Sequence, residues 1–448
     1  MSDNIQNFDL TRRLFLQSSA LGLTATASGL LLPKSALAEP KVSAAIKIVI
    51  AGGGAAGLAT ASRLAERLDE KAEIIVIEPN KHHIYQPGFT LIAAGLKPAD
   101  YSVSDTGDYL PPQVKWIEAK VEEFNPDANQ VRLSNGENLN YDYLFVTTGL
   151  KLDYDAIEGM DTKLIGTNGL GSIYHSAVGA EKTWKLLDEF SRKGGNAVLL
   201  RPNTEMKCSG APLKYTFIVR DYLHRRGTLA KSHISYNSNN GSFFSVPIVS
   251  EKVRMMFEAR DIHYHYHRIL KAIDPAKRIA TFESKDEGKV ELPYDFINVI
   301  PPQVAPDAVQ NSPLAWQTGP WKNEGWMEVS KSTLRHVRYP NVFGVGDIAG
   351  VPKGKTAASV KWQVPVAVDH LICELQGKES QLIYNGYTSC PLITEVGRAM
   401  LVEFDYNNNL QPSFPGIIHP LEDSWTSWLL ETIGLKPTYL SMLRGSGK

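Results

Sequence analysis

Short runs of consecutive apolar residues recur along this chain, and several of them end at glycine or at an acidic residue. The runs at 48–50, 74–77, 141–149 and 196–200 have the composition of parallel strands that are buried on both faces. Stretches with helical spacing lie between them, such as residues 180–190. Strands that alternate with helices in this way predict an α/β fold with parallel sheets.

The first apolar run leads into GGGAAG, in which Gly52, Gly54 and Gly57 fill the spacing G-x-G-x-x-G. The first glycine permits a tight turn, the second lets the backbone approach a pyrophosphate, and the third lets helix and strand pack closely. The helix that begins here would point its free N–H groups at the phosphates. Glu78 ends the next apolar run and is placed to accept a ribose hydroxyl. This order of strand, glycines, helix, strand and acid predicts a dinucleotide site.

A later stretch is expected to return to the same site. Residues 339–347 read as a strand that ends in Gly-Asp, and KTAA at 355–358 opens a long helix. A carboxylate at a strand end suits a ribityl hydroxyl, and a basic helix N-terminus suits an electron-rich flavin carbonyl. The loops at 81–89 and 147–149 are expected to reach the ligand. The candidate cofactor residues are Gly52, Gly54, Ala56, Gly57, Glu78, Gln86, Val121, Gly149, Asp347, Lys355 and Thr356.

The second half of the chain departs from the first at the corresponding turn. After the strand at 196–200, a site for a nicotinamide dinucleotide should repeat the glycine pattern. The sequence there is RPNTEMKCSGAP, with two prolines and long side chains where backbone must approach phosphate. NAD(P)H is therefore a poor fit, which argues against a type II NADH dehydrogenase.

The chain has three cysteines: Cys208, Cys373 and Cys390. Cys373 lies on the apolar stripe of a helical segment and is expected to be a core residue. Cys208 and Cys390 each lie beside small residues and proline, in what reads as a turn. Composition allows two interpretations, a structural disulfide or a redox pair that relays electrons beside a flavin.

Six stretches together resemble the sulfide:quinone oxidoreductases of the flavoprotein disulfide reductase superfamily, in particular their mitochondrial-type branch. They are GGGAAG, HHIYQPGFTLIAAG, GLGSIYHSAVGAEKTW, PNTEMKCSGAP, YPNVFGVGDIAGVPKGKTAA and GYTSCPLITEVGRAMLVEFDY. The two stretches that carry cysteine are much more specific than the glycine pattern. The resemblance implies two Rossmann-like domains arranged as in glutathione reductase. It also implies an FAD-dependent enzyme that oxidises sulfide and reduces a membrane quinone.

The resemblance also implies roles for the cysteines. Sulfide would attack a Cys208–Cys390 disulfide, Cys390 would keep the sulfur as a persulfide or polysulfide, and Cys208 would leave as a thiolate that donates to the flavin. Lys207 either lowers the pKa of Cys208 or is a plain solvated lysine. Some branches attach FAD through a further cysteine in the region 166–176, where this chain has none, so FAD is expected to be non-covalent. The sulfur acceptor and the quinone stay open.

Three other assignments stay open beside this one. The first is the flavoprotein subunit of a flavocytochrome c sulfide dehydrogenase, which passes electrons to a cytochrome c. The second is the type II NADH:quinone dehydrogenase, and the third is a non-enzymatic flavin-binding protein with a structural disulfide. A net charge of −1 gives no global field for nucleic acid, and a homo-oligomer is compatible with the sequence.

The N-terminus has the features of a twin-arginine (Tat) export signal. Arg12 and Arg13 precede an apolar stretch that ends in ALA at 36–38. This signal predicts a periplasmic protein, peripheral on the outer face of the cytoplasmic membrane. The mean hydropathy of −0.20 and the lack of a long apolar run in the body argue against a spanning helix.

The C-terminal tail, from Ser424 onward, places Trp425, Trp428, Leu429 and Ile433 on one helical face. Such a face is typical of an interfacial helix that docks on a membrane, although packing on the body or a dimer interface is an alternative. Removal of the tail is expected to leave flavin reduction by sulfide nearly intact.

The expected division of the chain has a small antiparallel insertion, with strands at 114–121 and 130–133, inside the FAD domain. The predicted parts are the signal peptide at 1–38, the FAD-binding domain at 44–165 and 301–395, the second Rossmann-like domain with the first redox cysteine at 166–300, and the membrane- and quinone-docking region at 396–448.

Overall fold

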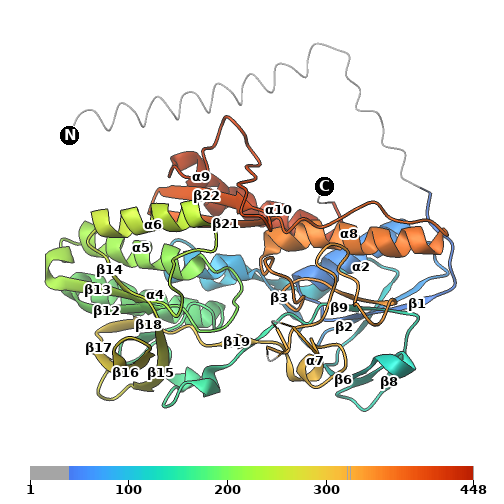
Figure 1. Ribbon diagram of the computed structural model, residues 1–448, viewed down its shortest axis with the longest axis horizontal. Helices are drawn as coiled ribbons and strands as arrows, with labels where there is room; N and C mark the ends of the chain where they lie inside the picture. Colours follow the sequence, from blue (N-terminus) through green and yellow to red (C-terminus); the bar gives the residue numbers. More distant parts are fainter. Residues whose placement is uncertain (1–39, 320, 323, 447–448) are drawn as a thin grey trace, which may run out of the picture. The chain divides into compact units, whose positions relative to one another are not determined.

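The computed structural model describes residues 40–319, 321–322 and 324–446 of the chain. The predicted export signal at 1–38 therefore lies outside the described residues. The part from Lys41 onward forms one compact unit, and Figure 1 shows that it is built around two separate sheets of parallel strands.

The first sheet has five parallel strands in the order β20-β9-β1-β2-β5. They are β1 (Lys47–Ala51), β2 (Glu73–Ile77), β5 (Val114–Ile117), β9 (Tyr143–Val146) and β20 (Val342–Gly344). Ile48, Val49 and Ile50 have no exposed surface, as the apolar run predicted. The late strand β20 pairs with β9, which agrees with the predicted return of the chain to this unit.

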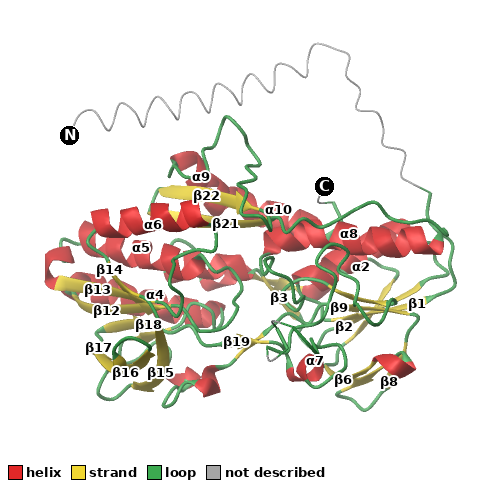
Figure 2. Ribbon diagram, viewed as in Figure 1, coloured by secondary structure: helices red, strands yellow, loops and turns green. Residues whose placement is uncertain are grey.

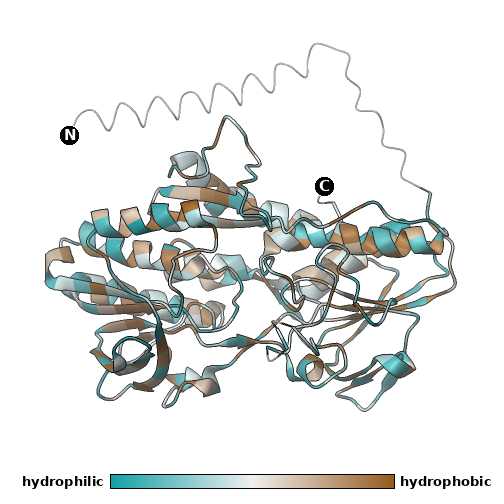
Figure 3. Cartoon of the chain, in the orientation of Figure 1, coloured by the Kyte–Doolittle hydropathy of each residue, from teal (hydrophilic) through white to brown (hydrophobic). Residues whose placement is uncertain are grey.

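Helices α2 (Ala55–Arg67) and α8 (Ala357–Leu375) pack against each other beside the first sheet (Figure 1). Figure 3 shows brown and teal residues side by side along α8, as expected for a helix with one face on the core and one in water. The amino ends of both helices lie beside the carboxyl ends of the strands, because each helix follows a parallel strand in the chain.

A three-stranded antiparallel sheet lies between β5 and β9 in the chain. Its strands are β6 (Val121–Asn125), β7 (Gln130–Leu133) and β8 (Asn138–Asn140). The prediction that residues 114–121 belong to this insertion is wrong, because Val114 pairs in parallel with Ile74 of β2. An edge strand has one open side and shows the same apolar–polar alternation as an antiparallel strand, so the pattern could not separate the two.

The second parallel sheet has the order β11-β18-β12-β13-β14. Its strands are β11 (Leu170–Gly171), β12 (Gly195–Leu200), β13 (Ser232–Asn237), β14 (His263–His265) and β18 (Phe296–Asn298). Helices α4 (Ala177–Lys193), α5 (Ala211–Arg225) and α6 (Pro247–Ala259) pack on it, as Figure 2 shows in red. An antiparallel sheet of β15 (Arg268–Asp274), β16 (Ile279–Ser284) and β17 (Gly288–Pro293) precedes β18.

Short ladders mark the passages of the chain from one sheet to the other. β10 (Lys151–Leu152) pairs with β19 (Gln303–Val304), so the outgoing and returning segments lie side by side. After β2, the strand β3 (His82–Ile84) pairs with β4 (Val103–Asp105). The short helices are α3 (Phe89–Ala93) and α7 (Asp307–Gln310).

A hairpin of β21 (Thr388–Glu395) and β22 (Arg398–Phe404) packs on α5 of the second sheet. Leu392 and Ile393 are fully buried in the core that this sheet shares with its helices. The predicted boundary between residues 395 and 396 falls in the turn of this hairpin and separates two strands that pack as one element. The other predicted domain boundaries stay predictions.

The C-terminal tail consists of α9 (Trp425–Leu429), the π-helix η8 (Leu430–Gly434) and α10 (Leu435–Leu443). Tyr439, Met442 and Leu443 are buried in the core of the first sheet, and Ser62 Oγ donates to the Leu443 carbonyl at 2.7 Å. The tail therefore packs on the body, which is the alternative that the sequence also allowed, and the expected effect of its removal on flavin reduction stays a prediction. Ile433 keeps 62 % of its surface exposed. None of the helices in the described part of the chain has both the length and the apolar character needed to cross a bilayer.

Candidate active site

Two cysteines from distant parts of the chain meet at the start of α5. Cys208 lies in the loop between β12 and α5, whereas Cys390 lies in β21, where it pairs with Val402. The prediction that Cys390 sits in a turn is therefore wrong. The two thiols are free and share a hydrogen bond. A Cβ on Gly210 would lie 2.4 Å from the Cys390 sulfur, so only glycine admits this cysteine.

The backbone of Cys208 has a φ of 47°, in the left-handed region that non-glycine residues rarely adopt. Three hydrogen bonds hold this conformation. The Cys208 N–H donates to the Lys355 carbonyl at 2.9 Å, and the Cys208 carbonyl accepts from the Ala211 N–H at 2.8 Å and the Tyr174 hydroxyl at 3.1 Å. Such strain persists where surrounding contacts over-determine it, and it is common at functional sites.

The two thiols differ in acidity. The hydrogen bond from Cys390 lowers the pKa of Cys208 to about 7, because it stabilises the thiolate more than burial disfavours it, and Lys214 adds to the effect. The same hydrogen bond, together with burial, raises the pKa of Cys390 well above its ordinary value. In the reduced pair, Cys208 is therefore the more acidic thiol and Cys390 the one that keeps its proton more firmly.

The cation beside Cys208 is Lys214 of α5, which the sequence analysis missed. Its Nζ lies 3.0 Å from Oε1 of Glu431 in the π-helix η8, and the two side chains are only 4 % and 5 % exposed. Burial opposes the charge of Lys214, but Glu431 and the two cysteines raise its pKa above the ordinary value. A signal was available, since Lys214 is the one charged residue in the apolar stretch APLKYTFIV and a buried charge requires a partner.

Lys207, which the sequence suggested beside Cys208, makes a different contact. Its Nζ donates to Oε1 of Gln86 at 2.5 Å, and its backbone N–H donates to Oε1 of Gln303 at 2.9 Å. Burial lowers the pKa of Lys207, although Asp347 and Cys208 oppose this. Lys207 thus ties the loop of the first cysteine to the loop after β3, where the candidate residue Gln86 lies.

The three glycines of the fingerprint have the separate surroundings that their predicted roles require. Gly52 has a φ of 110°, and a Cβ there would lie 2.6 Å from the Thr147 carbonyl oxygen. A Cβ on Gly57 would lie 1.8 Å from the Gly52 carbonyl oxygen, so glycine is required for α2 to pack on the turn. Around Gly54, the residue that precedes α2, no atom lies within 4 Å of such a Cβ. A side chain would therefore clash with the protein at the first and third glycines, whereas the space beside the second glycine is empty.

The strand ends next to this turn also carry groups suited to a dinucleotide. Glu78 Oε2 accepts from the Gly53 N–H at 2.8 Å, which places this carboxylate beside the glycine turn. The space around Gly149 is open, and the buried Thr148 hydroxyl next to it has no hydrogen-bond partner. An open cradle at a helix N-terminus and an unsatisfied hydroxyl beside it fit the pyrophosphate and ribose groups of FAD.

The segment after β20, where the chain has returned to the first sheet, supplies three further candidate residues. Asp347 follows β20, and burial raises its pKa in spite of Lys207 and Lys355. Lys355 Nζ donates to the Asp347 carbonyl at 2.5 Å and lies 3.6 Å from the centre of the Trp326 ring, and its predicted role toward the flavin stays a prediction. Burial lowers the pKa of Lys355 to about 8. Thr356 caps α8 by accepting from the Ser359 N–H at 3.1 Å, which leaves the first N–H groups of α8 for a ligand.

The last two candidate cofactor residues, Ala56 and Val121, pack against other parts of the protein. A Cβ on Gly346 would lie 3.0 Å from the Ala56 Cβ, so Ala56 joins the start of α2 to the segment before Asp347. Val121 is the first residue of β6, and its side chain is buried in the core. Only its backbone is available to a ligand.

The turn after β12 differs from the glycine turn after β1. Pro202 and Met206 are buried in it, and the Thr204 hydroxyl accepts from the Gln303 N–H at 2.7 Å. At its end, Gly210 is packed against Cys390, Leu392 and Phe244. The second sheet thus has side chains where a nicotinamide dinucleotide would place its pyrophosphate.

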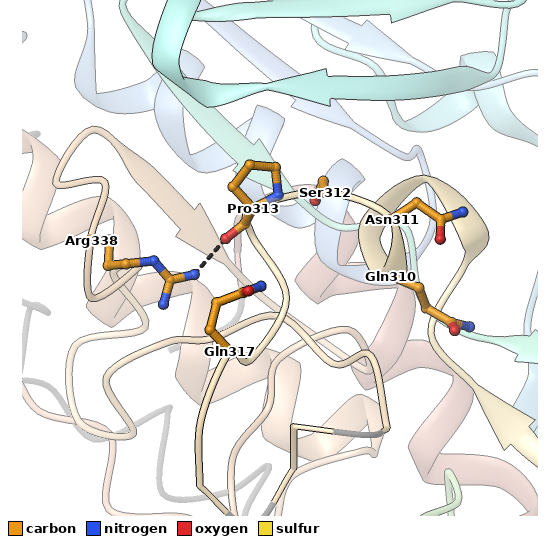
Figure 4. Close-up of a pocket in the computed structure, with 6 residues that line it drawn as sticks. All are labelled: Gln310, Asn311, Ser312, Pro313, Gln317 and Arg338. Atoms are coloured by element: carbon orange, nitrogen blue, oxygen red, sulfur yellow. Dashed lines mark hydrogen bonds between the residues drawn. The ribbon is translucent and has the colours of Figure 1, made fainter.

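A surface pocket of about 540 Å³ lies elsewhere, around the loop after α7 (Figure 4). Its lining residues are Gln310, Asn311, Ser312, Pro313, Gln317 and Arg338. Arg338 donates to the Pro313 carbonyl and pairs with Glu328. The pocket shares no residue with the cysteine pair or the glycine turn.

Comparison with known proteins supports the fold and identifies the family. Residues 46–190 match the pyridine nucleotide-disulphide oxidoreductase family. The mitochondrial sulfide:quinone oxidoreductase of Mus musculus is 37% identical over 82% of this chain and 80% of its own length. The enzyme of the same name from Dictyostelium discoideum is 37% identical over 84% and 81%. The crystal structure of sulfide:quinone oxidoreductase from Aquifex aeolicus superposes with a TM-score of 0.71 at 20% identity, covering 89% and 92% of the two chains.

These comparisons contradict the predicted periplasmic location, because the two relatives from Mus musculus and Dictyostelium are mitochondrial proteins. The features that suggested a twin-arginine signal, Arg12 and Arg13 before a stretch rich in small residues, do not discriminate well. Mitochondrial presequences are also rich in arginine and serine.

Proposed function

Because the chain belongs to the sulfide:quinone oxidoreductase family, we propose that Cys208 and Cys390 are the redox pair through which this FAD-dependent enzyme oxidises sulfide. The observation that carries the proposal is the meeting of the two thiols at the start of α5, with opposite shifts in acidity. A purely structural bridge has no need of this asymmetry. The alternative electron acceptors, cytochrome c and NAD, are not favoured by the relatives.

The difference in acidity assigns a direction to the chemistry. When the pair is oxidised, HS⁻ attacks the Cys390 sulfur, the S–S bond breaks, and Cys208 leaves as the thiolate. A thiol of lower pKa is the better leaving group in such an exchange, which favours Cys208 in this role. Cys390 then carries the added sulfur as a persulfide.

The pair returns to the disulfide when a sulfur acceptor removes the outer sulfur atom from Cys390. The two cysteines then form the S–S bond again and release two electrons. Bound FAD would supply the two-electron acceptor that this step needs and the link to quinone. Lys214 favours the thiolate of Cys208, and the strained backbone at Cys208 keeps its sulfur aimed at Cys390.

FAD would be held at the carboxyl end of the first sheet, without a covalent bond. Gly52, Gly54 and Gly57 admit the pyrophosphate to the N-terminus of α2, while Glu78 and Thr148 suit the ribose and phosphate groups. Asp347 and the N-terminus of α8 are placed for the flavin end. The residues from 396 to the C-terminus are proposed as the side from which quinone enters, since Phe414, Ile417 and Ile433 expose apolar surface there.

Anaerobic titration of the purified enzyme tests this function. Sulfide is expected to bleach the flavin absorbance, whereas NADH is expected to leave it unchanged, because the turn after β12 is filled by side chains. Rapid bleaching by NADH at low concentration would contradict the assignment. Failure of sulfide to bleach the flavin would contradict the role of the cysteine pair.

A further inference from the structure

The ion pair of Lys214 and Glu431 connects the tail to the cysteine pair. Lys214 lies in the second turn of α5, the helix that begins just after Cys208, and Glu431 lies in the π-helix η8 near the C-terminus. At 3.0 Å and about 95 % burial on both sides, neither charge can be solvated by water. Isolated charges at such depth are strongly unfavourable, so each residue depends on the other.

The surroundings of Cys208 contain both signs of charge. Lys214 stabilises negative charge on the Cys208 sulfur, and Glu431 opposes it. Four further titratable groups that face Cys208 among the described residues are Cys390, Tyr174, Tyr85 and Lys207. Lys214 and Glu431 are therefore the fixed cation–anion couple beside this sulfur, and their effects have opposite signs.

The local backbone conformation at Glu431 also supports a functional role for this residue. Residues 430–434 form a π-helix between two α-helical segments. A π-helical turn is rare, and where one interrupts an α-helix it is frequently at a functional site. Here it directs Glu431 inward while the adjacent Ile433 stays exposed.

We propose that Lys214 and Glu431 are positioning residues for sulfide oxidation: Lys214 stabilises the Cys208 thiolate, and Glu431 shares this cation and thereby limits the thiolate population. This inference rests on the proposed role of Cys208 as the thiolate that leaves the disulfide. It makes the C-terminal tail a part of the redox site, because the tail carries the carboxylate that neutralises Lys214.

The test is the pH dependence of Cys208 alkylation by iodoacetamide. The holoenzyme is reduced with dithionite, so that no electron leaves the thiols, and the Cys208 peptide is followed by mass spectrometry. Glu431→Gln should move the midpoint of the alkylation rate about one pH unit lower, and Lys214→Gln should move it about one unit higher. Lys214→Arg keeps the charge and should stay near the parent midpoint.

Glu422→Gln is the matched control, since it removes one exposed carboxylate a few residues before α9. It should leave the midpoint unchanged. Bound FAD and melting temperature are measured on the same preparations. If Glu431→Gln lowers the melting temperature but leaves the midpoint at its parent value, the pair is purely structural and the inference is overturned. Full turnover of Cys208→Ser would instead remove the proposed function, and it would leave the alkylation result standing.

Discussion

The two parallel sheets use the same supersecondary element for opposite purposes. In each, a strand leads through a turn into a helix whose first residues face the carboxyl end of the sheet. The glycine before α2, Gly54, has open space where a side chain would be, whereas the glycine before α5, Gly210, is in contact with Cys390. One helix N-terminus is left free for a phosphate, and the other is covered by a cysteine from a distant hairpin.

The comparison teaches that glycine before a helix does not by itself indicate a nucleotide. At Gly54 the missing side chain leaves space that no protein atom fills, and at Gly210 it makes room for another part of the protein. The helix dipole is equally useful in both places, because phosphate and thiolate are both anions. The second sheet thus has the strand–turn–helix geometry of a dinucleotide fold, with the Cys208–Cys390 pair at the position of the ligand.

The largest expected effect comes from the cysteines themselves. Cys208→Ser and Cys390→Ser should each lower sulfide-dependent quinone reduction by roughly a thousandfold or more, because the attack on a disulfide is no longer available. Bound FAD should be unchanged, because the glycine turn is untouched. Turnover, bound FAD and melting temperature are measured together. A structural bridge that closes so long a loop would stabilise the fold by about 5 kcal/mol, so early melting with normal turnover would favour that reading.

Gly210→Ala tests the helix N-terminus that is covered by Cys390, at the start of α5. The new Cβ would lie 2.4 Å from the Cys390 sulfur and must displace it, while the backbone at Gly210 itself permits alanine. Misplacement of a reacting group by about 1 Å lowers rates by about a hundredfold, and we expect a loss of turnover of this order. FAD content should stay at the parent level. Normal turnover would show that Cys390 tolerates a different position.

Gly54→Ala makes the same change at the start of α2, where the space beside the glycine is empty. No protein atom opposes the new Cβ, so the melting temperature of the FAD-free protein should not change. The affinity for FAD should fall by about tenfold to a hundredfold, because backbone hydrogen bonds to the pyrophosphate are lost. Equilibrium binding of FAD to the stripped protein measures this. Unchanged affinity would mean that the open space at Gly54 is not the pyrophosphate site.

The smallest expected effect is the difference between the alkylation rates of Cys208 and Cys390. With a pKa of about 7, Cys208 should alkylate at a rate that falls tenfold per pH unit below this value and levels off above it, because its thiolate is present at higher pH and lost at lower pH. Cys390, whose pKa is raised, should stay nearly inert over the same range. Peptide-level alkylation from pH 5 to 9, compared with the exposed thiol of glutathione, provides the measurement. Equal rates for both cysteines would contradict the assignment of roles.

Local features of the sequence were sufficient for four strands of the first sheet, but not for its edge strand β5. The glycine turn, Glu78 and the return of β20 follow from short-range rules on turns and buried strands. The meeting of Cys208 and Cys390 depended on resemblance, since no local rule joins a loop to a strand so far along the chain. Lys214 was missed because its partner Glu431 is supplied by the tail. The position of Lys355 Nζ over the Trp326 ring and beside two carbonyl groups depends on contacts that no local rule supplies.

The late arrival of β20 in the first sheet has a consequence for the order of folding during synthesis. All strands of the second sheet, from β11 to β18, leave the ribosome before β20, so this unit can form its sheet first. The first sheet must wait for Val342–Gly344, and its core is closed only when Leu443 reaches Ser62. Domains usually fold from the N-terminus onward, but here the N-terminal unit is completed last. The proposed flavin site in the first sheet is therefore completed after the loop of Cys208 has been synthesised. A chain that ends before its final helix would lack a complete cofactor site.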